Sequence, residues 1–344
     1  MPSGASAQGL SHSRLHVADR VTQPALTGGA LVYRSPGPRG DDLKVLDLAT
    51  GRRVLLHDTG SAAASIESVR AVPGLAAIGV RARTGRDGLA TGILSFAADA
   101  PGPRVVTARG FTMSDGAGGA GCGGVVTLED LTPDGVIVTE EAVDPCGRSA
   151  ARASVVRTYG PAGEHEIWRL GARGALELLE DRKRVSFAGR RLLVWSLASA
   201  RLVRPGSSSV ALPSARSTVL YQADASARGR LVAAELTVGR PGTLARVRSL
   251  AGRAPPRGGR VLTRSRARLP DARFCGERLV VWSVGPGGRQ RLRVRRPGHP
   301  PVGYRGGTRV ASGRISGFAC DSGSYAVVTR TGRRRAVVDV FRLP

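Results

Sequence analysis

The hydrophobic residues of this chain occur in short runs, rich in Val, Leu and Ala, that are separated by turn residues. Residues 30–58 show this best, because the apolar segments ALVYRS, LKVLDL and RRVLLHD alternate with the turn segments PGPRGDD and ATG. Short segments bounded by Gly, Pro and Asp predict β-strands. The one hint of a helix, at residues 175–181, has a Leu-Glu alternation that suits a strand equally well. We therefore predict an all-β protein.

One segment of eleven residues, called the phrase below, occurs twice in the sequence with small changes. Residues 187–197 read FAGRRLLVWSL and residues 274–284 read FCGERLVVWSV, with seven of eleven positions identical. The core of the phrase is a turn ending in Gly or Arg and then an apolar run, and it recurs with a mean spacing of about 49 residues. A period of roughly 40–50 residues with several short strands predicts a β-propeller. The apolar runs begin near positions 30, 75, 136, 192, 231, 279 and 325, which predicts seven blades, while the short interval from 192 to 231 leaves six open.

The two ends of the chain predict how such a ring would close. The last repeat has only three candidate strands, SGFACDSG, SYAVVTRT and AVVDVFRLP. Residues 13–18, SRLHVA, can supply the fourth strand, and pairing of the N- and C-terminal strands would close the ring. We expect residues 1–12 to be a flexible segment, residues 13–344 to form one domain, and the glycine-rich residues 116–124 to be a loop insertion.

Two segments resemble a known family. LKVLDLATG at residues 43–51 looks like the third strand and turn of TolB-type, WD-repeat-like β-propellers, and LTPDGVIV at residues 131–138 resembles that family's turn into its second strand. The resemblance implies a propeller that serves mostly as an interaction scaffold. It carries over no catalytic residue, because the fold alone does not fix a function.

The chain is strongly basic, with a formal net charge of +26, and nearly all of its cations are arginines, since the only lysines are Lys44 and Lys183. Such a surplus attracts anions at low salt. The arginine runs at 293–296 and 333–335 are typical of solvated outer strands or turns, and they lack the interleaved aromatic residues of a nucleic-acid groove. We expect nucleic acid to bind only without sequence preference. An even distribution of arginines would count against a polyanion binder.

Four cysteines occur without any Cys-x-x-Cys pair, which argues against a zinc site. Cys275 and Cys320 stand at nearly equivalent places in consecutive repeats, and Cys122 and Cys146 flank the first two strands of one repeat. We expect both pairs to form disulfides, which would place the protein in an oxidising compartment. The alternative is four buried free thiols.

Few residues point to chemistry. Glu140, Glu141 and Asp144 form the densest acidic group and are weak candidates for ligand binding, although alternation in a strand would send Glu140 and Glu141 to opposite faces. The five histidines are scattered without metal-ligand spacing, and the glycine-rich stretch lacks the Gly-Lys-Ser/Thr of a phosphate loop. We name no catalytic residue, metal or cofactor. Trp195 and Trp282 are expected to pack between blades, with ligand stacking as the alternative.

These observations favour a non-catalytic binding or scaffold protein of the cell exterior or envelope, with a protein or an envelope polymer as partner. We expect a monomer. An enzyme that hydrolyses or eliminates glycans at a channel mouth is one alternative, and a non-specific polyanion binder is another. No apolar run is long enough to span a membrane as a helix. Ala5-Ser6-Ala7 has the form of a signal-peptide cleavage site, although an ordinary flexible terminus or a cytoplasmic location fits equally well.

The paired cysteines give a first test. Denaturation without a reducing agent should expose fewer than two free thiols per chain, because both pairs are predicted to be oxidised. Titration with a thiol reagent measures this number. Two or more equivalents would exclude the double pairing.

Overall fold

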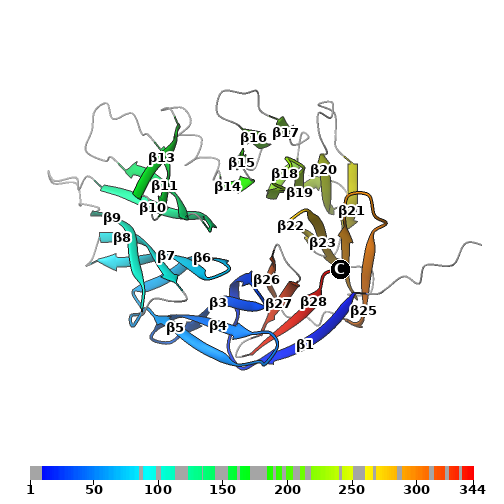
Figure 1. Ribbon diagram of the computed structural model, residues 1–344, viewed down its shortest axis with the longest axis horizontal. Helices are drawn as coiled ribbons and strands as arrows, with labels where there is room; N and C mark the ends of the chain where they lie inside the picture. The colour runs from blue at the N-terminus through cyan, green and yellow to red at the C-terminus, as the bar shows by residue number, and fades with distance from the viewer. Residues whose placement is uncertain are drawn as a thin grey trace, which may run out of the picture. The chain divides into compact units, whose positions relative to one another are not determined.

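The structure is a computed structural model, and it describes residues 10–84, 88–97, 102–112, 123–133, 135–143, 154–160, 163–170, 184–188, 191–195, 199–203, 210–213, 218–239, 242–250, 260–265, 269–284, 289–309, 314–321, 325–332 and 335–344. All regular elements in these residues are β-strands (Figure 1). The all-β prediction is confirmed. None of the described residues lies in a helix long and apolar enough to cross a membrane.

The chain divides into two compact units, which are described one at a time. Unit 1 comprises Met1–Leu15, Ser186–Val328 and Val338–Pro344, and unit 2 comprises His16–Val185 and Thr329–Val337. Every sheet in the described residues has four strands, and all of the strand pairs with a determined register are antiparallel.

Three sheets belong to unit 2, and in each of them the strands follow chain order. The first contains β2 (Thr22–Thr27), β3 (Ala30–Gly37), β4 (Gly40–Asp47) and β5 (Arg53–Asp58). The second contains β6 (Ala64–Val72), β7 (Leu75–Thr84), β8 (Gly88–Ala97) and β9 (Arg104–Thr112). The third contains β10 (Gly123–Thr132), β11 (Gly135–Val143), β12 (Ser154–Gly160) and β13 (Gly163–Leu170).

Three further sheets belong to unit 1, apart from the first two residues of β14. They contain β14 (Arg184–Ala188), β15 (Arg191–Trp195), β16 (Ser199–Val203) and β17 (Val210–Pro213); β18 (Thr218–Ala225), β19 (Leu231–Gly239), β20 (Gly242–Leu250) and β21 (Arg260–Ser265); and β22 (Asp271–Cys275), β23 (Arg278–Val284), β24 (Arg289–Arg295) and β25 (Val302–Arg309).

The remaining sheet joins the two ends of the chain. Its order is β1 (Ser11–Val17), β28 (Ala336–Arg342), β27 (Tyr325–Thr331) and β26 (Arg314–Cys320), so the N-terminal strand completes the last three strands of the chain (Figure 1). The sequence predicted this completing strand at residues 13–18, and β1 begins two residues earlier.

The second strand of each sheet forms where the sequence predicted an apolar run, since β3, β7, β11, β15, β19, β23 and β27 begin within one residue of the seven predicted positions. These strands are apolar on both faces. In β27, for example, Ala326, Val327 and Val328 are all fully buried. Because successive side chains of a strand point to opposite faces, three buried neighbours require cover on both sides of the sheet.

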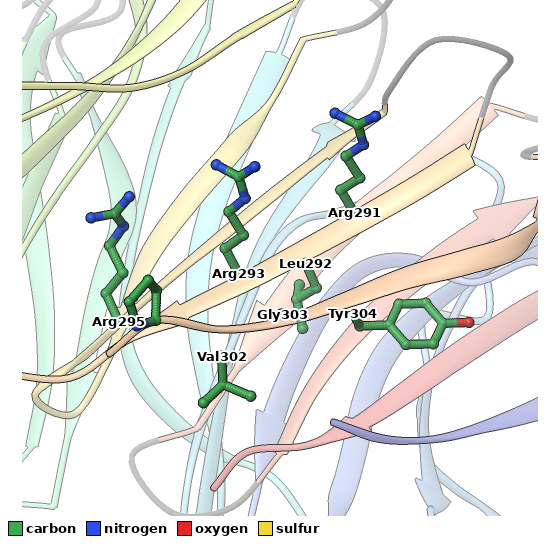
Figure 2. Close-up of a pocket in the computed structure, with 8 residues that line it drawn as sticks. Arg291, Leu292, Arg293, Arg295, Val302, Gly303 and Tyr304 are labelled. Atoms are coloured by element: carbon green, nitrogen blue, oxygen red, sulfur yellow. The ribbon is translucent and has the colours of Figure 1, made fainter. Parts of the chain in front are cut away.

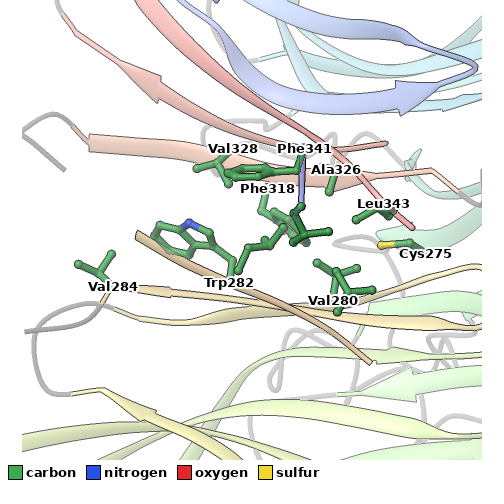
Figure 3. Close-up of a cluster of buried hydrophobic side chains, with 12 residues drawn as sticks. Cys275, Val280, Trp282, Val284, Phe318, Ala326, Val328, Phe341 and Leu343 are labelled. Atoms are coloured by element: carbon green, nitrogen blue, oxygen red, sulfur yellow. The ribbon is translucent and has the colours of Figure 1, made fainter. Parts of the chain in front are cut away.

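That cover comes from the neighbouring sheet within each unit. In unit 1 a cluster that includes Trp282, Leu292, Phe318 and Phe341 fills the space between the sheet of β22–β25 and the sheet of β26–β28 (Figure 3). Unit 2 has a comparable cluster between the sheets of β2–β5 and β6–β9. Face-to-face packing of consecutive small sheets is therefore the common principle of both units.

A disulfide between Cys275 and Cys320 joins the end of β22 to the end of β26, with their Cα atoms 5.5 Å apart. This predicted pair is confirmed. Cys122 and Cys146 lie outside the described residues, as do residues 175–181 and most of the glycine-rich segment.

The two repeated tryptophans differ in exposure. Trp282 is buried, and its indole N–H donates a hydrogen bond of 3.2 Å to Oε1 of Gln290. Trp195 packs against the cluster around Leu193 but is only half-buried, so the predicted burial holds for Trp282 and was too strong for Trp195. Trp195 lies in β15 and Trp282 in β23, at equivalent places in two sheets.

Replacement of Trp282 by Ala should lower the free energy of unfolding by roughly 3–5 kcal/mol, because it leaves a cavity in a buried hydrophobic cluster of unit 1. Urea denaturation followed by circular dichroism measures the change. Trp195→Ala is the matched control and should cost clearly less. Equal losses in the two variants would contradict the different burial of the two indoles.

Candidate functional site

Of the three acidic candidates, Glu140 is the one whose side chain the structure describes. Glu140 lies in β11, and its carboxylate accepts a 2.6 Å hydrogen bond from the Tyr159 hydroxyl. The same carboxylate is within 3.3 Å of Arg109 and 3.2 Å of Arg157. These contacts connect β11 to β12 of its own sheet and to β9 of the preceding sheet, and they favour a structural role for Glu140.

The other two acidic candidates give no further information. Glu141 follows Glu140 in β11, but its side chain lies outside the description. Asp144 lies outside the described residues. A ligand-binding role for these three residues stays a prediction. In the part of the chain that the structure describes, no group of three or more His, Cys, Asp or Glu residues is placed to hold a metal ion.

The arginines, in contrast, are strongly concentrated in one part of the sequence. Residues 241–320 contain eighteen arginines, no lysine and only two acidic residues, Asp271 and Glu277. This stretch is less than a quarter of the chain but carries more than half of its net charge. The arginines are therefore distributed unevenly along the sequence. An even distribution would have argued against a polyanion binder.

Within this stretch, β24 carries a row of three arginines. Its sequence alternates between buried Leu292 and Val294 on one face and Arg291, Arg293 and Arg295 on the other. Figure 2 shows the three arginine side chains leaving β24 on the same side. Alternate residues of an antiparallel strand are about 6.8 Å apart, so the row extends over roughly 14 Å. We call Arg291, Arg293 and Arg295 the arginine row.

A cavity of about 400 Å³ lies beside the arginine row, and it is lined by Arg291, Leu292, Arg293, Arg295, Pro301, Val302, Gly303 and Tyr304. The register of β24 and β25 explains why space remains there. Gly303 is the partner of Arg293, so β25 has no side chain at this position, whereas Val302 points to the other side of the sheet (Figure 2).

The row is electrostatically uncompensated in the described residues, where none of its three guanidinium groups has an ion pair or a hydrogen bond to a carboxylate. The segments of residues 241–320 that lie outside the description contain no Asp or Glu. Desolvation lowers the pKa of the Arg295 guanidinium, and the positive charges of Arg260 and Arg293 lower it further. The Nε of Arg295 is also buried without a hydrogen-bond partner in this part of the structure.

The opposite face of the same hairpin is fully satisfied. The Tyr304 hydroxyl is 3.2 Å from Nδ1 of His12, and its ring lies against His12 and Phe341. Nε2 of His12 is in turn 3.1 Å from the buried carboxylate of Asp339. Asp339 also accepts hydrogen bonds from Arg14 at 2.7 Å and from Gln290 at 2.7 Å. This network fixes β1 to the sheet and holds Tyr304 away from the arginine row.

The sequence pattern pointed to part of this site, the arginine run at residues 293–296, which is typical of solvated charges. In the structure these charges belong to an alternation of Arg291, Arg293 and Arg295 along one strand. The alternation was a readable signal. The cavity was not readable, because it depends on the register that sets Gly303 opposite Arg293.

Solved structures with similar folds are propeller-like. A structure from work on two prolyl endopeptidases aligns with a TM-score of 0.58 at 14% identity, over 92% of this chain and 47% of that chain. The acylaminoacyl peptidase of Pyrococcus horikoshii aligns with a TM-score of 0.56 at 10% identity, over 94% of this chain and 51% of that chain. Oligogalacturonate lyase in complex with manganese aligns with a TM-score of 0.52 at 11% identity, over 98% of this chain and 97% of that chain.

At these identities the likeness establishes the fold alone, and it supports a β-propeller. The chain spans about half of the length of the peptidases and nearly the whole length of the lyase. No protein-family model matches the sequence, and neither does any curated protein.

The contacts of Glu140 give a prediction for this site. Glu140→Gln should lower the free energy of unfolding by about 2 kcal/mol, because two arginines and a tyrosine lose their charged acceptor. Chemical denaturation measures the change, with the exposed Glu67→Gln as a control that should stay within about 0.5 kcal/mol of the wild type. A neutral Glu140→Gln variant would argue for a functional carboxylate.

Proposed function

We propose that this protein is a non-catalytic β-propeller binding module whose ligand is anionic and contacts the arginine row. The observation that carries the proposal is a line of three guanidinium groups without carboxylate partners in the described residues, beside a cavity of about 400 Å³. Guanidinium groups present planar pairs of N–H donors that match carboxylates and phosphates. An anionic ligand would supply the negative charge that the described residues do not place beside the row.

The composition of the cavity favours binding over catalysis. Its lining consists of three arginines, one tyrosine and small or apolar residues. The tyrosine hydroxyl is occupied by His12, so no carboxylate, imidazole or amine of the lining is available as a general base. The excess positive charge of residues 241–320 would also speed the encounter with an anionic ligand by long-range attraction.

The proposal includes an architecture and a location. The seven four-stranded sheets of the described residues would be the blades of one ring, closed where β1 completes the last blade. The Cys275–Cys320 disulfide supports an oxidising location, outside the cell or in its envelope. The nearly full-length likeness to oligogalacturonate lyase supports an acidic glycan as the class of ligand.

The same likeness favours one second candidate, an enzyme that cleaves acidic glycans by elimination. In such a reaction a base from outside the cavity lining would remove the proton beside the uronate carboxylate, a C=C bond would form, and the glycosidic oxygen would leave and take up a proton. The arginine row could neutralise that carboxylate. The ultraviolet absorbance of the unsaturated product would report this activity in the binding experiment below.

The experiment replaces the row with neutral side chains in the variant Arg291→Gln/Arg293→Gln/Arg295→Gln. Binding of polygalacturonate should weaken roughly tenfold or more, and the dependence of log K on log salt should lose about one unit of slope per arginine. Calorimetric titration at several salt concentrations measures both values, with uncharged dextran as the negative ligand.

The matched control removes three exposed arginines of unit 2, in Arg81→Gln/Arg83→Gln/Arg104→Gln, and changes the net charge by the same amount. This variant should bind nearly as well as the wild type. Equal weakening in both triple variants would assign the binding to diffuse charge and would overturn the proposed site.

A further inference from the structure

We infer that the site selects a linear acidic polysaccharide, which lies along β24 with successive carboxylates on the arginine row and its backbone in the space above Gly303. This inference rests on the proposed function and adds to it the linear form of the ligand and the way it is seated.

The length of the row excludes a single small anion as the full ligand. Arg291 and Arg295 are about 14 Å apart along the strand, and Arg293 lies midway between them. One carboxylate or phosphate can contact only one or two of these groups. All three are used only by a ligand that repeats its negative charges along a line.

The space beside the arginine row lies over Gly303, where β25 has no side chain. A Cβ atom at Gly303 would meet only the Leu292 carbonyl oxygen, at an ordinary contact distance of 3.6 Å, so the backbone there can accept a larger residue. Gly303, which has no side chain, leaves this space open. The resulting cavity is within the size range of ordinary ligand pockets, which suits one or two sugar rings.

The aromatic residues near the site argue against a nucleic acid as the preferred ligand. Proteins that bind single-stranded nucleic acids stack bases on exposed aromatic rings. Tyr304, the one aromatic residue of the lining, is held on the other face by His12 and Phe341, and Trp282 is buried. The site therefore offers charge and space without a stacking surface.

The test fills the space without changing any charge. Gly303→Val places a branched side chain opposite Arg293, and β-branched residues suit a strand. Binding of a galacturonate hexamer should weaken at least tenfold in this variant, whereas Gly303→Ala should change it by less than about threefold. Circular dichroism and thermal melting verify that each variant is folded.

A second measurement uses the wild type alone. Affinity should rise more than tenfold from a galacturonate monomer to a trimer and then change little up to the hexamer, because the row has three positions. A thymidine oligonucleotide with the same number of charges as the hexamer should bind more weakly and should be insensitive to Gly303→Val.

The possible failures can be told apart. In one outcome, Gly303→Val binds the hexamer as tightly as the wild type, whereas the arginine triple variant binds it weakly. The anion site would then be supported, and the placement of the polysaccharide over Gly303 would be refuted. An affinity independent of uronate length also overturns it, and tighter binding of the oligonucleotide would assign the site to nucleic acid. If the arginine triple variant binds normally, the proposed function itself fails.

Discussion

A β-strand that is apolar on both faces must be covered on both faces, and this constraint governs the whole structure. The second strand of each sheet is such a strand, as the consecutive buried residues Ala326, Val327 and Val328 show for β27. A sheet of four strands cannot cover itself. Within each unit, consecutive sheets therefore pack face to face, and clusters such as the one around Trp282 fill the spaces between them.

The same constraint places the arginine row. In β24 the buried face is committed to Leu292 and Val294, so the alternating positions must point away from that cluster. Some arginines elsewhere in the described residues are paired with acids, as in Arg34 with Asp41 at 2.9 Å and in the buried Arg248 with the buried Glu235. The row lacks such partners in the described residues, and this contrast is the physical basis of the proposed anion site.

Much of the fold could be predicted because it follows from local patterns. The spacing of the apolar runs located the second strands, and the shortage of strands in the last repeat located β1. The pairing of Cys275 with Cys320 followed from their equivalent places in two repeats. The exposure of Trp195 was misjudged, because identical residues within the phrase do not fix how far neighbouring side chains cover each copy.

The candidate site was harder to predict, because it depends on pairing between strands. Nothing in the sequence fixes which residue of β25 faces Arg293, and that residue, Gly303, is one of those that line the cavity. The pairing of β2 with β3 also contains an irregularity that the sequence does not announce. The register shifts beside Gln23, whose φ of 49° is unusual for a residue other than glycine. Glu140 was identified from sequence as an acidic candidate, but its partners Arg109 and Tyr159 come from other strands.

The central claim is that an anionic chain occupies the arginine row beside Gly303. A crystal structure of the protein with a galacturonate trimer tests it most directly. We expect electron density for the sugar along β24, with carboxylates within hydrogen-bond distance of at least two of Arg291, Arg293 and Arg295. A well-ordered trimer bound elsewhere, with the row facing only solvent, would show that the row is not the anion site.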